Sequence, residues 1–341
     1  MIIFSLPRRV RHLSSAPPLF FLLVCIMIEI PKIPYEKPVM DIDWFIERII
    51  SKWFKISDEQ SAKDFLNKKW YYHISSYIKC FCDIVNSEDK TISDNIDFNN
   101  VISLYSLDKE LQKELLSAVL EIETLIKSDF VQILSLKYNS PFWYANNQNI
   151  TSRTNDKMED LLEKINKDTS KSAACIHFLA KYDSKYLPVW HLVEFASFWS
   201  FTKLFHYLKD QDLFIFCKKY WAILQNWNSL IYDKDQLKQR LKWLADLRNR
   251  LAHLEITRSP RGLPWIILPW FQWNIKLNTV SAYIQLMHHF LKMIDENMAN
   301  DYYNNCYDIL FKISQIWWIH SREFNKIWLN ENREKRFNKN F

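Results

Sequence analysis

The sequence almost lacks glycine: Gly262 is the only one among 341 residues. Glycine normally supplies the tight turns and close backbone approaches of phosphate-binding loops, so its scarcity excludes P-loop and dinucleotide-binding motifs. What the sequence has instead is Leu, Ile, Lys and Glu at helical spacing, together with an aromatic content of 16%. We therefore predict an all-α fold, a helical bundle whose core contains many large rings.

The chain also lacks the spacings of common metal sites. Its six cysteines contain no C-x-x-C pair and its nine histidines contain no H-E-x-x-H. The adjacent His288 and His289 cannot both face one ion from a helix. We predict no metal and no other cofactor. Cysteines scattered in this way are typical of a reduced, cytoplasmic protein.

A long apolar run is missing as well. The run from Leu19 to Ile28 covers ten residues, whereas a spanning helix needs about 20, so no integral membrane association is expected. A basic stretch at residues 8–12 precedes this run, as in a secretory signal, but a Glu-Ile-Pro sequence follows it in place of a small-residue cleavage site. We expect residues 1–26 to reflect a start assigned too far upstream, with Met27 as the true start. A short membrane-associating leader is the alternative.

The formal net charge of +6 is a mild excess, half of it from three arginines within residues 8–12. Such a charge permits RNA binding without arguing for it. A local cluster matters more, because the C-terminal tail sets basic residues among aromatic ones, as surfaces that bind the backbone and stack bases do. The candidate RNA-binding residues there and upstream are Arg250, Arg258, Lys326, Arg333 and Arg336. The alternative is a solvated terminal helix, because glutamates are interspersed along the tail.

Caps and prolines divide the chain into segments. Residues 1–40 are predicted to be a leader and an extended lead-in, residues 41–260 one helical domain, and residues 261–341 a helical C-terminal extension. Within the domain we expect helices over 41–53, from Ser57-Asp58-Glu59-Gln60 onward, over 74–81, from Leu107-Asp108 onward, over Val189 to Lys209, and after Asp233 and Asp235. The helix from Leu107-Asp108 keeps one apolar face to the core through Leu111, Leu115, Val119, Ile122 and Ile126.

Near the end of the domain, the hexapeptide Arg248-Asn249-Arg250-Leu251-Ala252-His253 places an arginine, an amide and a histidine within about one and a half helical turns. On a helical wheel Asn249 and His253 lie side by side at one edge of the apolar arc, whereas Arg248 falls inside it. An unpaired buried guanidinium is costly, so an anion is expected to meet Arg248. The spacing alone leaves open whether that anion is an internal carboxylate or a phosphate.

Six sequence blocks follow one another between residues 50 and 258. They are Tyr71 to Tyr77, Leu104 to Leu111, Glu121-Ile122-Glu123, Pro141-Phe142-Trp143, Pro188-Val189-Trp190 with Glu194 and Ser197-Phe198, and Leu247 to His253. In this order they resemble the blocks of the Abi-like (abortive-infection) family, a branch of the HEPN superfamily, among them Y-Y-R-L-S-G-Y, L-Y-x-F-D-x-x-L, P-x-W…E…S-F and L-R-N-x-x-A-H. No clear resemblance extends over residues 261–341.

The sequence departs from the family pattern at several positions. His73 and Ser76 replace the arginine and glycine of the first block, and Trp199 replaces the usual glycine after Ser-Phe. Past its histidine the family often continues H-x-R-x-x-N, a pattern that Leu254 to Ser259 does not follow. The arginine and the histidine of the motif are kept, whereas several residues that surround them in the family pattern are not.

The resemblance implies a HEPN-like helical bundle with additional N- and C-terminal helices, and a metal-independent ribonuclease whose R-x4-6-H motifs meet across a homodimer. The matching catalytic candidates are Arg248, Asn249 and His253. A histidine takes and gives protons near neutral pH, an arginine stabilises a phosphorane-like transition state, and the asparagine orients the histidine or holds a phosphate oxygen. The chain has one R-x4-6-H, so two copies are expected to supply acid and base. Glu194 is the expected internal partner of Arg248.

Two functions from different classes follow from this resemblance. The first is an endoribonuclease toxin of phage defence, with RNA as its substrate and a neutralising protein or RNA as a partner. The second is a non-catalytic RNA-binding or sensing module of abortive infection or toxin–antitoxin regulation, which the departures after His253 favour slightly. A third interpretation is a helical scaffold in which Arg248 is simply ion-paired.

Overall fold

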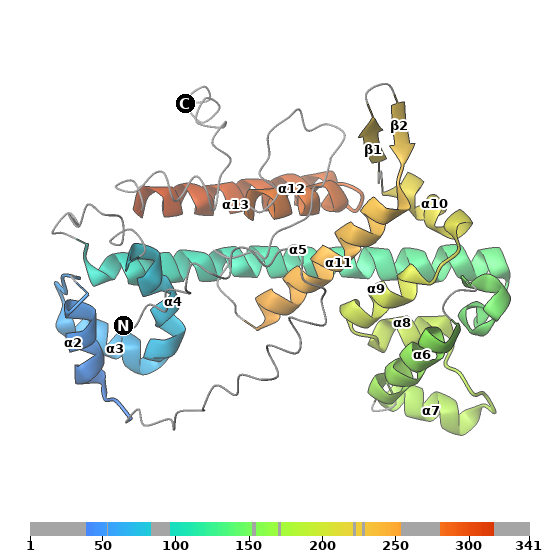
Figure 1. The fold of residues 1–341 in the computed structure, drawn as a ribbon, viewed down its shortest axis with the longest axis horizontal. Coiled ribbons are helices and arrows are strands. Elements are labelled where there is room, and N and C mark those ends of the chain that lie inside the picture. The colour runs from blue at the N-terminus through green and yellow to red at the C-terminus, as the bar shows by residue number, and fades with distance from the viewer. Residues whose placement is uncertain are drawn as a thin grey trace, which may run out of the picture.

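A single long helix, α5 (Phe98–Tyr138), runs through the middle of the molecule, and the other helices lie along it (Figure 1). The structure, a computed structural model, describes residues 39–52, 54–82, 96–151, 155–169, 172–220, 223–226, 229–253 and 280–316. Over these ranges the regular elements are helices apart from one β-hairpin, which confirms the predicted all-α class. The predicted leader at 1–26 and the C-terminal tail with Lys326, Arg333 and Arg336 lie outside the described residues.

Helix α5 begins and ends at clear local signals. The carboxylate of Asp97 accepts a hydrogen bond from the backbone N–H of Asn99, and Asn139 ends the helix in the left-handed conformation, at φ 47°. All five predicted core positions between them are buried, namely Leu111, Leu115, Val119, Ile122 and Ile126. The periodicity of the sequence therefore placed the buried face of this helix correctly.

The predicted start of this helix at Leu107-Asp108 is wrong. Asp108 lies inside α5, fully buried, where its carboxylate accepts hydrogen bonds from the Tyr77 hydroxyl at 2.6 Å and from the Gln112 amide at 2.7 Å. Asp108 resembled an N-cap in the sequence because aspartate is common at that position. A tertiary contact, and not a helix end, explains its presence.

Three helices pack together at the N-terminal half of α5: α2 (Ile42–Ile50), α3 (Glu59–Lys69) and α4 (Tyr71–Cys82). Asp41 caps α2 by accepting from the backbone N–H of Trp44, and Asp58 caps α3 by accepting from that of Ser61. Both helices were expected from these segments. The polar loop expected over 87–99 falls mostly outside the described residues.

Seven short elements surround the C-terminal half of α5. They are η2 (Trp143–Ala145), η3 (Asn147–Asn149), α6 (Asn155–Thr169), α7 (Ala173–Lys181), α8 (Val189–Phe195), α9 (Phe198–His206) and α10 (Asp210–Lys219). The single helix predicted from Val189 to Lys209 is wrong, because the backbone turns extended at Ala196 and Ser197. The Ser197 hydroxyl then caps α9 by accepting from the backbone N–H of Ser200 at 3.1 Å.

The remaining elements are β1 (Ile223–Asn226), β2 (Ser229–Tyr232), α11 (Lys234–Ala252), α12 (Val280–Leu291) and α13 (Glu296–Ile316). The two strands pair antiparallel, with Ile223 opposite Tyr232, and the sequence did not indicate them. The strand considered at Pro264 to Leu268 lies outside the described residues. Helix α11 crosses α5 and also contacts α9, while α12 and α13 pack along α5 (Figure 1).

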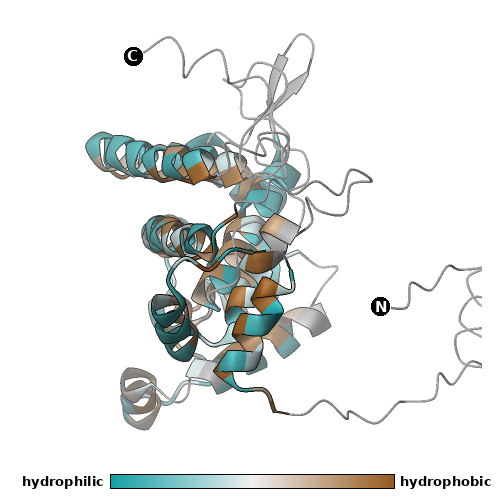
Figure 2. Ribbon diagram, turned by 90° about the vertical axis from the view of Figure 1, so that its left-hand side faces the viewer, coloured by the Kyte–Doolittle hydropathy of each residue, from teal (hydrophilic) through white to brown (hydrophobic). Residues whose placement is uncertain are grey.

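Apolar stretches of the helices face one another and polar stretches face outward, which gives the molecule one contiguous core (Figure 2). Within the described part of the chain, no helix has both the length and the apolar character needed to cross a membrane. Cys175, Cys217 and Cys306 are buried free thiols. The fold thus holds α11 firmly against α5, and the hexapeptide lies at the end of α11.

Candidate functional site

Helix α11 presents the hexapeptide at its C-terminal end. The Asp233 carboxylate caps the start of α11 by accepting from the backbone N–H groups of Asp235 and Gln236, which confirms the helix predicted after Asp233 and Asp235. Its leucines at 3.6-residue spacing are buried against α5 and α9, namely Leu237, Leu241, Leu244 and Leu251. The last turn, with Arg248, Asn249 and His253, therefore ends at the edge of the core.

The side chain of Arg248 lies against α5 and not against α8. Its Nε is 3.6 Å from Oε2 of Glu123, and the Arg248 side chain keeps 34% of its surface exposed. The expectation that Glu194 would pair with Arg248 is wrong: Glu194 is exposed on α8, while Glu123 is buried on α5. The physical reason is that the apolar arc of α11, which contains Arg248, packs on α5.

Glu123 belongs to a small charged cluster. Lys127, one turn further along α5, places its Nζ 2.7 Å from Oε1 of Glu123. The same ammonium group donates to the backbone oxygen of Ala196 at 2.9 Å, where α8 ends. One carboxylate thus faces two cations, Lys127 and Arg248, and the cluster has one excess positive charge.

The contact between Arg248 and Glu123 is loose. Neither Nε of Arg248 nor Oε2 of Glu123 has a hydrogen bond within the described structure, although both atoms are buried. A guanidinium–carboxylate pair at full strength is shorter and often bidentate. Glu123 therefore holds Arg248 in place by charge without saturating its hydrogen-bond donors, which leaves Arg248 able to bind a second anion.

Asn249 and His253 differ from Arg248 in exposure. Asn249 is half-buried, and His253, the C-cap of α11, is exposed. They are joined through the backbone, since the N–H of His253 donates to the carbonyl of Asn249 at 3.0 Å. No hydrogen bond to the His253 ring occurs among the described residues. Arg248 and His253 are about 140° apart around the helix axis, so they do not converge on one point within one chain.

Two other arginines of α11 face inward. Arg240 is fully buried, and burial lowers its pKa to about 10. Arg250, proposed from the sequence as an RNA contact, is half-buried and lies near Tyr283 of α12, where it partly offsets the rise in the Tyr283 pKa that burial causes. Arg258 lies outside the described residues.

Sequence reasoning missed the role of Glu123 and Lys127. Their signal was present as an acid and a base four residues apart, on a helix whose flanking residue Ile122 faces the core. Glu123 also stood in one of the six blocks, without an assigned role. Which of the acids at 121, 123 and 194 meets Arg248 depends on how α11 crosses α5, and no local pattern specifies that crossing.

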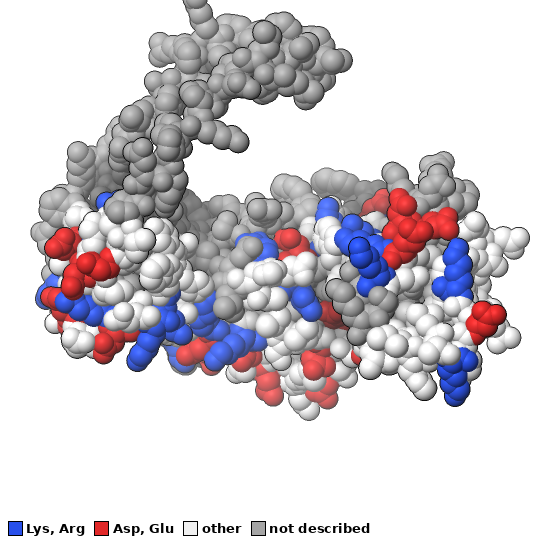
Figure 3. Space-filling view, turned by 90° about the horizontal axis from the view of Figure 1, so that it is seen from below, with Lys and Arg blue, Asp and Glu red and all other residues white. Residues whose placement is uncertain are grey.

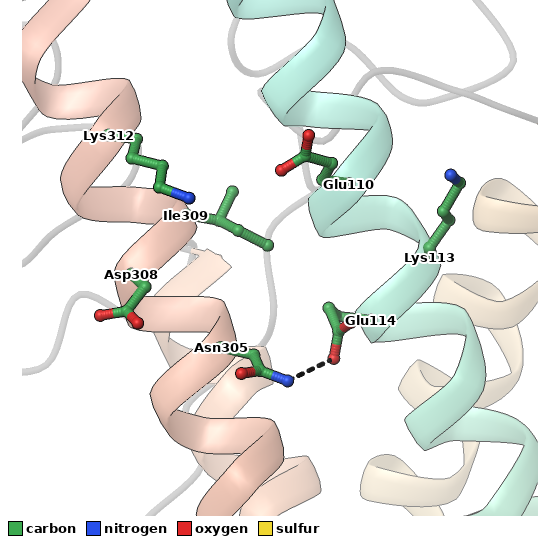
Figure 4. Close-up of a pocket in the computed structure, with 7 residues that line it drawn as sticks. All are labelled: Glu110, Lys113, Glu114, Asn305, Asp308, Ile309 and Lys312. Carbon is green, nitrogen blue, oxygen red and sulfur yellow. Dashed lines mark hydrogen bonds between the residues drawn. The ribbon is translucent and has the colours of Figure 1, made fainter.

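A groove of about 240 Å³ lies elsewhere, between α5 and α13 (Figure 4). Asn305 donates to Glu114 across it at 3.5 Å, and Glu110 and Lys312 point toward each other from the two helices. Its lining mixes acidic and basic side chains and includes no residue of α11. Over the described ranges, no three His, Cys, Asp or Glu side chains gather as metal ligands would. The hexapeptide and the Glu123 cluster therefore form the better candidate for chemistry.

Comparison with known proteins relates the sequence of the chain to one protein family. A family model described as Abi-like protein matches residues 64–257, more than half of the chain. The matched range includes α4, α5 and the whole of α11, and therefore the buried Tyr77–Asp108 contact, Glu123 and the hexapeptide. No curated protein and no solved structure matches the chain.

Proposed function

The chain belongs to the Abi-like protein family, and from this premise we propose that it is a metal-independent endoribonuclease toxin of abortive infection. The observation that supports this best is the position of Arg248, one-third exposed beside a buried carboxylate that orients it without saturating it. The placement in the HEPN superfamily is part of the same proposal. RNA is the proposed substrate.

The proposed chemistry needs no metal. His253 takes the proton of a ribose 2′-hydroxyl, the freed oxygen attacks the adjacent phosphorus, and the bond from phosphorus to the 5′-oxygen breaks. A second histidine gives a proton to the departing 5′-oxygen, which leaves a 2′,3′-cyclic phosphate and a 5′-hydroxyl. Proton transfer of this kind contributes about 10²–10⁴-fold to the rate. Arg248 stabilises the added charge on phosphorus, and Asn249 holds a phosphate oxygen or orients His253.

A homodimer supplies the second histidine. One chain has one R-x4-6-H, and its Arg248 and His253 diverge around α11 by about 140°. A two-fold axis near the end of α11 would bring Arg248 of one copy toward His253 of the other. Glu123 is a positioning residue in this arrangement, since it contacts Arg248 and not the phosphate. A neutralising protein or RNA is the proposed partner that restrains the activity in the cell.

The test compares four variants of the full chain under an inducible promoter. Arg248→Ala and His253→Ala are expected to abolish growth arrest and to lower the yield of RNA ends with a 5′-hydroxyl by about 10²-fold or more. Lys242→Ala, at an exposed position of the same helix, and His177→Ala, at an exposed position of α7, are the matched controls and should behave as wild type. If Arg248→Ala and His253→Ala remain as toxic as wild type, the nuclease proposal is wrong.

One observation favours a second function, a non-catalytic RNA-binding or sensing module. No group among the described residues hydrogen-bonds the His253 ring, whereas a general base is usually oriented by a neighbour. If purified wild type binds RNA and never produces 5′-hydroxyl ends, this second function replaces the first.

A further inference from the structure

The groove between α5 and α13 brings acidic and basic side chains together without pairing them. Its volume is about 240 Å³. The lining comes from both helices and consists of Glu110, Lys113, Glu114, Asn305, Asp308, Ile309 and Lys312. Within the part of the chain that the structure describes, none of the charged residues in this lining forms an ion pair. Their charges therefore remain open to an occupant of the groove.

Charged side chains elsewhere on the surface do pair. Lys63 of α3, for example, lies 2.7 Å from a carboxylate oxygen of Asp43 and 2.8 Å from one of Glu59. On the face seen from below, Lys and Arg side chains lie beside those of Asp and Glu (Figure 3). The unpaired charges of the groove thus differ from the usual arrangement of charges on this molecule.

The two sides of the groove present opposite charges to each other. Glu110 on α5 and Lys312 on α13 point toward one another, and the apolar side chain of Ile309 lies between them (Figure 4). Lys113 and Asp308 point away from the gap in the same view. The gap is therefore bordered by a carboxylate on one side, an ammonium group on the other and an apolar surface between the two.

The acidic side of the groove suits an ammonium group. Glu110 and Glu114 lie one turn apart on α5, where like charges repel each other. Glu114 accepts a long hydrogen bond from the Asn305 amide at 3.5 Å, and the carbonyl oxygen of Asn305 accepts none among the described residues. A primary ammonium group has three donors. Two carboxylates and one carbonyl could accept all three, and the added positive charge would relieve the repulsion between the carboxylates.

A buried polar residue of α13 borders the same groove. Tyr302 lies on the face of α13 that contains Asn305 and Ile309, because positions three and seven residues apart share a helix face. It is 5% exposed, and its hydroxyl has no hydrogen bond to nitrogen or oxygen within the described structure. Burial raises its pKa well above the ordinary value, and the charge of Glu114 is among the smaller causes. Such hydroxyls are rare in packed cores and mark positions that serve more than packing.

We propose that this groove binds a free α-amino acid, with its ammonium group at Glu110 and Glu114, its carboxylate at Lys312 and an apolar side chain on Ile309. A simple cation would be repelled by Lys312 and a simple anion by the two acids, whereas a zwitterion meets both. The volume is below that of pockets for drug-sized ligands, which suits so small a molecule.

This ligand would join two parts of the chain. Helix α5 lies within the range that the family model matches, residues 64–257, whereas α13 lies outside it. A ligand that bonds to both helices stabilises the packing of the C-terminal helices on the family domain. The proposal goes beyond the proposed nuclease and does not depend on it.

The test measures binding of L-leucine by saturation-transfer NMR. The full-length parent carries His253→Ala, so that the result does not depend on cleavage. A Kd on the order of 1 mM is expected for so small a ligand. Two analogues each lack one charged group: 3-methylbutylamine has no carboxylate, and 4-methylpentanoate has no ammonium group. Each should bind at least about ten-fold more weakly, because it loses a charge-assisted hydrogen bond.

Variants assign the two charged groups of the ligand to their partners. Glu110→Gln and Lys312→Gln are each expected to raise the Kd of L-leucine by about ten-fold or more. In Lys312→Gln, leucine and 3-methylbutylamine should bind equally, since the carboxylate has lost its partner. Glu121→Gln and Lys242→Gln change exposed charges outside the groove. These controls should stay within about two-fold of the parent.

The proposal is overturned if the parent does not bind L-leucine at about 10 mM, or if either analogue binds as tightly as leucine. Tighter binding of the diamine putrescine would show a cation site and would also contradict it. Equal affinities of Glu110→Gln, Lys312→Gln and the parent would do the same. Both positions are exposed, so the variants should keep the urea midpoint of the parent. Failure of this test leaves the roles of Arg248 and His253 untouched.

Discussion

Glu123 and Asp129 are buried acids of the same helix, yet their surroundings differ. The Asp129 carboxylate has both oxygens occupied, one by Lys219 and one by the Tyr220 hydroxyl, each at 2.6 Å. The Glu123 carboxylate has one oxygen occupied by Lys127, and the other faces Arg248 at 3.6 Å without a hydrogen bond. A satisfied acid ties α10 to α5 and contributes to stability, whereas an unsatisfied one leaves its cation available for a ligand.

The largest expected effect on stability comes from the satisfied site. Asp129→Ala leaves the buried Tyr220 hydroxyl without its acceptor and Lys219 without its partner. We expect the free energy of unfolding to fall by about 3 kcal/mol, at the lower end for a broken buried pair because Lys219 is partly exposed. Urea denaturation measures this. A loss below that of an exposed surface substitution would mean that Asp129 does not tie the two helices together.

The same region should also make stability depend on pH. His289 bonds to the backbone oxygen of Tyr220, and burial lowers its pKa to about 4. The unfolded state therefore binds a proton that the folded state does not, and stability falls as the pH drops from about 6.5 toward 4. We expect a loss of about 3 kcal/mol over this range. His289→Gln should flatten most of this fall in the urea midpoint, and His177→Gln should leave it unchanged.

At Glu123, the unsatisfied acid, a substitution should lower activity more than it lowers stability. Glu123→Gln removes the charge that holds Arg248 but leaves Lys127 bonded to the Ala196 carbonyl, so a loss of only about 1 kcal/mol is expected. Cleavage should fall by about ten-fold or more in kcat. The pH profile should keep its shape, because His253 is untouched. Glu123→Asp should restore part of the rate; if it restores none while Asp129→Ala lowers kcat equally, Glu123 has no positioning role.

The smallest effect is expected where an acid is exposed. Asp210 pairs with Lys234 at the surface, and water screens such a pair. Asp210→Ala should leave the urea midpoint and RNA cleavage unchanged. A clear shift in either would show that exposure does not distinguish the acids of this molecule, and the comparison of Glu123 with Asp129 would lose its basis.

Much of the helical framework could be predicted, because it depends on local signals. The caps at Asp58 and Asp233 and the apolar face from Leu111 to Ile126 follow from spacing and side-chain chemistry. The break at Ala196-Ser197 was missed because no proline or glycine marks it. The partner of Arg248 was missed because it depends on how two helices cross. The motif residues were found from their spacing on a helix and then from the resemblance, and their chemical role stays a prediction.

Subunit mixing tests the central claim, that one cleavage site uses His253 of both copies, most directly. Wild-type chains and an equal amount of His253→Ala chains are denatured together, refolded as a mixture and assayed for RNA ends with a 5′-hydroxyl. Random pairing leaves about a quarter of the dimers with both histidines, so the mixture should show about half of the cleavage of the same amount of wild type refolded alone. A mixture as active as the wild type refolded alone would contradict the claim.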